Sequence, residues 1–172
     1  MKYERFEELP VWKKAIELAE RIHDLTETDT FKTRFSLRDQ LERAALSVSN
    51  NIAEGFERGT TNELLFFLYI ARGSAGEVRS MLCFLDNRSA FRNLKSQISN
   101  LKLIAESCSR QLRGWADALQ NSGIKGQRHL NNKTRQIEKD RVDREAFLKE
   151  LARITESARK GRSAPSEMTE ET

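Results

Sequence analysis

The 172-residue sequence is poor in cysteine, proline and glycine, and it has no long run of apolar residues. Its two cysteines, Cys83 and Cys108, stand far apart and lack a second cysteine or histidine at metal-ligand spacing. The sequence therefore predicts neither a zinc site nor a disulfide framework, and the apolar neighbours of both cysteines favour buried free thiols. The longest apolar run, residues 64–71, is too short to cross a bilayer, and residues 1–10 lack an apolar signal region. We expect a cytoplasmic protein that does not bind membranes.

What the sequence does contain is charge. With 33% charged and 38% hydrophobic residues, the composition is typical of a soluble helical protein, and the length fits one domain plus an extension. The net charge of +4 is unevenly spread, because residues 1–119 hold 18 basic and 17 acidic residues (+1), whereas residues 120–172 hold 12 and 9 (+3). The basic character therefore belongs mainly to the C-terminal part and says little about the globular part.

Two segments in the first sixty residues place apolar residues at spacings of three and four, the pattern of an amphipathic helix. The first begins at Pro10, a residue suited to the first helical turn, and ends in the polar run 26–30. We expect the second segment to be capped by Ser36 and to end between Gly55 and Gly59.

Two further segments show the same periodicity. A third helix is predicted from Thr60, which has the spacing of a capping box with Glu63, to a break at residues 86–89. The fourth runs from Leu94 to Leu119 and alternates apolar steps of four and three. Four amphipathic helices with short connections predict an all-α protein, an antiparallel up-and-down four-helix bundle.

The bundle is predicted to occupy residues 1–121 and to be followed by a charged C-terminal extension. Glycines and basic residues predict a linker at residues 122–136, and a narrow apolar stripe predicts an extra amphipathic helix at residues 137–160. Residues 161–172 are predominantly polar or small, which predicts a disordered tail.

The second predicted helix carries an ordered polar stripe beside its apolar one. At about 100° per residue, five positions fall on one sector of the helix surface: Arg43, Ser47, Asn51, Glu54 and Arg58. A solvated flank with an internal Glu54–Arg58 ion pair would explain part of this order. The alternative is a surface that contacts another subunit or a partner.

The third predicted helix favours the contact surface. Once its core stripe is assigned, Phe66, Ile70 and Phe84 fall on another sector, where a monomer would leave them near water. Gly73 and Gly76 lie mid-helix, where glycine costs about 1 kcal/mol relative to alanine, so close approach by another backbone would compensate. We therefore predict a homo-oligomer packed through the second and third helices. The predicted contact residues are Arg43, Ser47, Asn51, Glu54, Arg58, Phe66, Ile70, Arg72, Gly73, Ser74 and Glu77.

The same region carries a specific family pattern. The chain contains LRDQLERAALSVSNNIAEGFERGT from Leu37 and FLYIARGSAGEV from Phe67, preceded by Phe6, Leu9, Val11, Trp12 and Ala15. With these motifs the chain resembles the 23S rRNA intervening sequence proteins, or S23 proteins, over residues 1–121. It departs from their pattern at Glu42, where a basic residue is common, and at Ser49, where a proline is common.

This resemblance implies a cytoplasmic bacterial protein that forms a ring-like homopentamer and whose molecular activity is poorly defined. The genes of some members lie within segments inserted into 23S rRNA genes. A structurally similar accessory protein of diversity-generating retroelements forms a basic pentameric barrel that binds nucleic acid and a reverse transcriptase. That similarity concerns the fold and carries little weight for function.

Patterns for catalysis or metal binding are weak. Glu20 and His23 have the Glu-x-x-His spacing of di-iron bundles, but such sites need two of these pairs and further glutamates. The only other histidine, His129, falls in the predicted linker, and the sequence offers no nucleophile–histidine arrangement or phosphate-binding glycine loop. We predict a protein that is not an enzyme and needs no cofactor or metal.

Basic residues in the extension suggest nucleic acid as a partner. The candidate contacts are Lys125, Arg128, Lys133 and Arg135, whose weak phosphate contacts would be multiplied in an oligomer. Nearby acidic residues such as Glu138 fit a merely solvated linker equally well. Two hypotheses follow: an oligomeric protein associated with RNA or DNA, and a scaffold or accessory subunit for a protein partner such as a reverse transcriptase.

Overall fold

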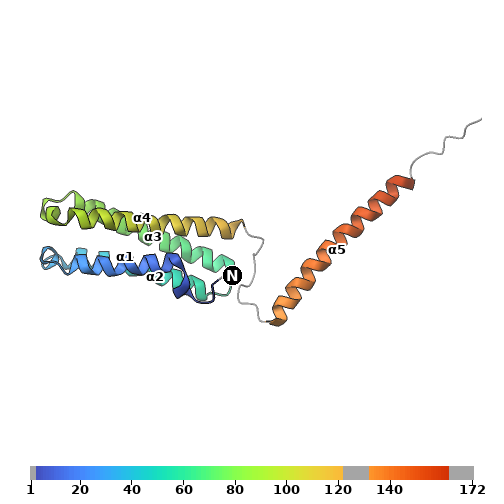
Figure 1. Ribbon diagram of the computed structural model, residues 1–172, viewed down its shortest axis with the longest axis horizontal. Helices are drawn as coiled ribbons and strands as arrows, with labels where there is room; N and C mark the ends of the chain where they lie inside the picture. The colour runs from blue at the N-terminus through green and yellow to red at the C-terminus, as the bar shows by residue number, and fades with distance from the viewer. Residues whose placement is uncertain (1–2, 122–131, 163–172) are drawn as a thin grey trace, which may run out of the picture. The chain divides into compact units, whose positions relative to one another are not determined.

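The computed structural model describes residues 3–121 and 132–162, which belong to two units, Met1–Arg128 and His129–Thr172. The main helices of the first unit are α1 (Pro10–Thr26), α2 (Phe35–Glu57), α3 (Thr61–Asp86) and α4 (Lys95–Gln120) (Figure 1). Three short 3-10 turns accompany them, at Phe6–Glu8, Asp29–Phe31 and Ser89–Leu94. In the described residues of the second unit the chain forms helix α5 (Asn132–Arg162). The prediction of an all-α protein with four packed helices and a further C-terminal helix is confirmed.

The contacts between helices show that neighbours in the bundle run antiparallel. The end of α3 meets the start of α4 where Lys102 Nζ lies 2.7 Å from Asp86 Oδ2, and the start of α3 meets the end of α4 where Gln120 donates to the Tyr69 hydroxyl. The middle of α2 faces the middle of α3, and α1 packs against both α2 and α4. The four helices therefore surround one core.

The core consists of the predicted apolar stripes. The stripe residues of α3 are all buried, and those of α4 are buried from Ile98 to Leu112, whereas Trp12 on α1 and Leu37 on α2 pack partly buried at the margin. The largest fully buried side chains are Phe31, Phe56, Leu18, Ile22, Leu25, Leu41, Ile52, Leu64, Leu68, Leu82, Leu85 and Ile98. Burial of this apolar surface is the main force that holds the four helices together.

The two predicted helix caps have different outcomes. Thr60 is the N-cap of α3, where its hydroxyl oxygen accepts a hydrogen bond from Glu63 N at 3.2 Å, as the capping box predicts. The prediction that Ser36 caps α2 is wrong, since α2 begins at Phe35 and its N-cap is Arg34. The Arg34 guanidinium donates to the Thr30 carbonyl and lies 5.3 Å from the centre of the Phe91 ring. Packing of the preceding turn therefore sets the start of α2.

The two cysteines also differ. Cys108 is buried in the core, and burial raises the pKa of its thiol to about 11. Cys83 is exposed, so the prediction of two buried thiols is wrong for this residue. It follows the buried Leu82 by one position, which rotates its side chain about 100° away from the core. None of the helices in the described ranges is both long and apolar enough to span a membrane.

Helix α5 begins at Asn132, five residues before the helix predicted from residue 137. Residues 132–136 are polar but have ordinary helix propensities, and Gln136 donates to Asp140 Oδ1 one turn later at 2.8 Å. Lys133 and Arg135, assigned from sequence to the linker, are thus helical. Lys125, Arg128 and most of the predicted tail, residues 163–172, lie outside the described residues.

Candidate subunit interface

The polar stripe of α2 and the second sector of α3 meet on one face of the bundle, here called the α2/α3 face. A chain of hydrogen bonds joins the two helices there. Asn51 Nδ2 donates to Ser47 Oγ at 2.9 Å, Ser47 Oγ lies 3.0 Å from Ser74 Oγ, and Ser74 Oγ donates to the Ile70 carbonyl at 3.1 Å. Since Ser74 donates to the carbonyl and Ser47 accepts from Asn51, Ser47 must donate to Ser74.

This chain has a structural consequence. Asn51 also donates to the Ser47 carbonyl at 2.7 Å, and Ser74 is nearly buried, so the polar groups are satisfied within the subunit. They fix the spacing and register of α2 against α3 where both helices reach the surface. The central part of the family motif therefore shapes this face.

The charged residues at either end of the α2 stripe are paired as well. Arg58 Nη2 lies 2.5 Å from Glu54 Oε1, and this hydrogen bond raises the pKa of the Arg58 guanidinium. The same guanidinium lies 5.1 Å from the centre of the Phe67 ring. At the other end, Arg43 pairs with Asp39 at 3.1 Å. The internal Glu54–Arg58 ion pair considered from sequence is thus present.

Large apolar side chains flank this polar line. Phe66 is 61% exposed and Phe84 52% on α3, with the exposed Ile70 between them. A single exposed residue of this kind is ordinary, but several along one face form an apolar surface.

The mid-helix glycines of α3 lie beside these residues and face open space. A Cβ added to Gly73 or Gly76 would meet no atom within 4 Å in the part of the chain that the structure describes. The close backbone approach predicted for these glycines is therefore not made by another helix of the same bundle. Their surface is available for a contact between molecules.

The structure brings together most, but not all, of the predicted contact residues. An open hollow between α2 and α3 is lined by Gln40, Arg43, Ala44, Ser47 and Glu77, so Glu77 lies close to Arg43 and Ser47 of the α2 stripe. Arg72 is partly buried and lies on a different sector of α3, since six residues advance it about 240° from Phe66.

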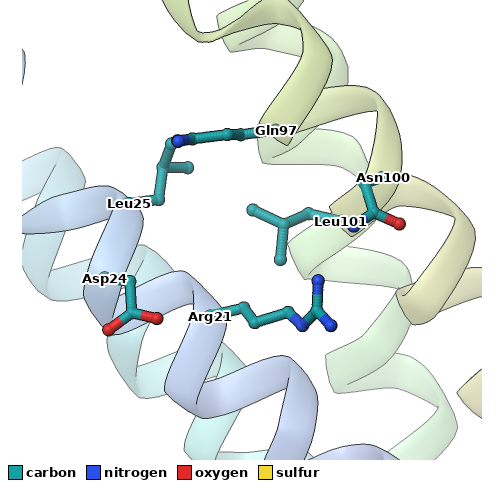
Figure 2. A pocket seen from close by; sticks show the side chains of 6 residues that line it. All are labelled: Arg21, Asp24, Leu25, Gln97, Asn100 and Leu101. Atoms are coloured by element: carbon teal, nitrogen blue, oxygen red, sulfur yellow. The ribbon is translucent and has the colours of Figure 1, made fainter.

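A second hollow, missed from sequence, lies between α1 and α4. Figure 2 shows that Arg21, Asp24 and Leu25 of α1 face Gln97, Asn100 and Leu101 of α4 across it. The spacing of three and four within each set places its members on one helix face, but sequence alone does not say which faces meet. Arg21 is paired with Glu17 at 3.1 Å.

Glu20 and His23, which have the spacing of half a di-iron site, are not joined by further metal ligands among the described residues. His23 is exposed, and its ring nitrogens lie 3.4 Å from Glu27 and 3.5 Å from Glu42. Among the described residues, three or more potential metal ligands do not come together anywhere. Arg38 and Thr26 already donate to the carboxylate of Glu42.

The comparisons with known proteins agree with the family pattern in the sequence. Residues 7–114 match the family model described as 23S rRNA-intervening sequence protein. No curated protein matches the chain. The matched range includes the whole α2/α3 face and ends before α5. The chain belongs to the 23S rRNA-intervening sequence protein family, which is not known as a family of enzymes.

Proposed function

We propose that this protein is a non-catalytic, cytoplasmic binding protein that forms a homo-oligomer through the α2/α3 face and associates with nucleic acid. The observation that carries the proposal is the exposed apolar surface of Phe66, Ile70 and Phe84. Covering these side chains with a second copy would remove apolar area from water at roughly 25 cal/mol per Å². The homopentamer implied by the resemblance is the assembly we expect.

Two further features support self-assembly through this face. The hydrogen-bond chain through Ser47 and Ser74 satisfies polar groups at its centre, so burial by a partner would not strand them. The open space at Gly73 and Gly76 lets another backbone come close without a clash. A face that is apolar, internally satisfied and free of steric obstruction is suited to a permanent contact.

Association with nucleic acid is supported by the basic balance of residues 120–172, where 12 basic residues stand against 9 acidic ones. Lys125, Arg128, Lys133 and Arg135 remain the candidate contacts. Each contact with a phosphate is weak, but linking several copies in one oligomer raises the effective concentration of the others.

A second candidate function is a scaffold for a protein partner, such as a reverse transcriptase. The specific observation in its favour is the apolar stripe of α5, where Phe147, Leu148, Leu151 and Ile154 are exposed. A helix with one exposed apolar stripe is the form in which many proteins bind a groove on a partner.

Light scattering of the full chain tests the assembly. Wild type should have a mass several times 19.9 kDa, and Phe66→Glu should dissociate it because a charge would be buried at the contact. Leu103→Glu is the matched control, since Leu103 is similarly exposed but lies on α4. Circular dichroism should show that both variants stay helical. A wild-type monomer at micromolar concentration would contradict the proposal.

Retention on a structured RNA separates the two partner classes. Binding to nucleic acid should weaken steeply between about 50 and 200 mM salt, because counterions are released when phosphates are neutralised. Capture of one protein that persists in high salt, with no retention on RNA, would favour the scaffold.

A further inference from the structure

Three of the five basic residues between positions 139 and 153 of α5 share one face of the helix. At about 100° per residue, Lys139, Lys149 and Arg153 fall within an arc of roughly 80°, and Val142 and Ala146 lie in the same arc. All three cations are exposed. Within this arc the sequence from 139 to 153 places no acidic residue. We call the surface of Lys139, Lys149 and Arg153 the basic face of α5.

The acidic residues of α5 lie on both borders of the basic face. Asp143 and Glu150 fall on one border, and Glu145 and Glu156 fall on the other. Glu150 on one border forms an ion pair with Arg153 of the basic face, with Arg153 Nη2 2.9 Å from Glu150 Oε1. The helix as a whole is mixed in charge, and composition alone therefore hides the basic face.

The position of the apolar stripe argues against a membrane as the ligand. Phe147, Leu151 and Ile154 lie on the other side of the helix from the basic face. A helix that lies in a membrane surface needs cations beside its apolar face, where they reach anionic headgroups. On α5, Asp143 and Glu150 lie between the basic face and the apolar stripe, whereas Arg141 and Arg144 lie beside the stripe on its far side. The cations of the basic face itself are therefore not placed to reach those headgroups.

The length of the basic face fits a phosphate backbone. From Lys139 to Arg153 the helix rises about 21 Å, at about 1.5 Å per residue. A nucleic acid presents a continuous line of negative charge over such a distance, about one charge per 1.7 Å of duplex axis. Lysine binds phosphate as a point charge, so cations spaced along one helix face need no particular base sequence.

We propose that the basic face of α5 is the surface through which the protein binds the phosphate backbone of nucleic acid. This inference rests on the proposed association with nucleic acid and assigns it to residues outside the family match. It moves the principal contacts from the predicted linker to Lys139, Lys149 and Arg153. Binding is independent of base sequence and gains strength from the number of copies in the oligomer.

Fluorescence anisotropy with a labelled RNA hairpin and the full-length chain tests the inference. The test variant is Lys139→Gln with Lys149→Gln, and the matched control is Arg141→Gln with Arg144→Gln, which removes the same charge from other sectors of α5. Glutamine keeps helix propensity close to that of lysine and arginine. Circular dichroism should give equal helicity for the two variants.

We expect the test variant to weaken RNA binding at least tenfold at low salt and to reduce the slope of log K against log salt by about two. The control should weaken it less than threefold. Equal loss in both variants would overturn the basic face while leaving nucleic-acid binding in place. A wild type that does not bind RNA or duplex DNA would overturn the association itself. Binding of a labelled polyglutamate peptide in preference to RNA, lost in the test variant alone, would reassign the face to an acidic protein.

Discussion

At Gly55, α2 and α3 are packed so closely that a side chain on this residue would not fit. A Cβ at this position would stand 2.7 Å from Phe67 Cβ and 3.2 Å from Leu64 Cδ1. Phe67 Cβ is fixed to the backbone of α3, so the helices themselves would have to move apart. The sequence showed Gly55 only as a weak point near the end of a helix, because the opposing helix cannot be identified from one chain segment.

Substitution Gly55→Ala should therefore destabilise the bundle. Overpacking costs about 1–3 kcal/mol, and the better helix propensity of alanine offsets about 1 kcal/mol of it. Gly114→Ala on α4 is the control: its Cβ would meet nothing within 4 Å among the described residues, so stability should rise by about 0.5–1 kcal/mol. Urea unfolding midpoints measure both, and a stabilised Gly55→Ala chain would contradict the packing argument.

At the scale of elements, Glu42 joins the start of α2 to the end of α1. Its carboxylate accepts hydrogen bonds from Thr26 Oγ1 at 2.5 Å and Arg38 Nε at 2.9 Å, with His23 3.5 Å away. Burial by itself raises the pKa of Glu42, but the hydrogen bonds from Thr26 and Arg38 outweigh it, and the pKa is lowered. The departure from the family pattern at this position thus has a structural role in this chain.

A lowered pKa in the folded state means that Glu42 stabilises the protein above its unfolded pKa, near 4.3, and that this contribution is lost as the pH falls through the folded value. Glu42→Gln should lower the free energy of unfolding by about 1 kcal/mol at pH 7, since a neutral acceptor forms weaker hydrogen bonds. The difference from wild type should shrink below about pH 4. Asp39→Asn, in an exposed pair with Arg43, should change stability little. Urea unfolding at pH 7 and below about pH 4 measures the difference, and an equal loss of unfolding free energy in Glu42→Gln under both conditions would contradict this account.

The elements also show how far sequence reasoning reaches. Thr60 and Glu63 were predicted as a cap because a capping box is local chemistry, and the structure confirms it. The prediction for Ser36 was wrong, because α2 begins at Phe35 and its N-cap is Arg34. Arg34 lies 5.3 Å from the ring centre of Phe91, a residue far along the chain, and sequence alone does not indicate such a contact. The hollow between α1 and α4 was missed in the same way. Periodicity determines which face of a helix is apolar, but tertiary packing decides which polar faces meet.

The α2/α3 face was predicted from sequence only in part. The spacing of residues on α3 placed Phe66, Ile70 and Phe84 away from its core stripe, and the structure shows all three exposed. The spacing did not show that Ser47 and Ser74 would bond across the two helices and satisfy the polar line from within. Residues 132–136 were assigned to a linker because they lack apolar periodicity, although they form the first turns of α5. Polar helices leave no periodic signal that sequence can detect.

At the scale of the whole molecule, the stability of the bundle should not depend on residues after Asn121. All buried apolar residues among the described ones lie between Leu9 and Ala116. A chain that ends at Asn121 should therefore unfold cooperatively, with a Tm within about 2–3 °C of the full chain, because the same apolar area is buried.

Light scattering of the truncated chain should give the same number of subunits, since the α2/α3 face is intact, whereas salt-dependent binding to RNA should be lost with α5. The untruncated chain carrying Lys139→Gln and Lys149→Gln is the control, because it should keep the Tm of the wild type while binding RNA at least tenfold more weakly than the wild type. A fall in Tm of more than about 5 °C on truncation would show that residues after Asn121 support the bundle, and it would remove the basis for treating α5 as a separate binding element.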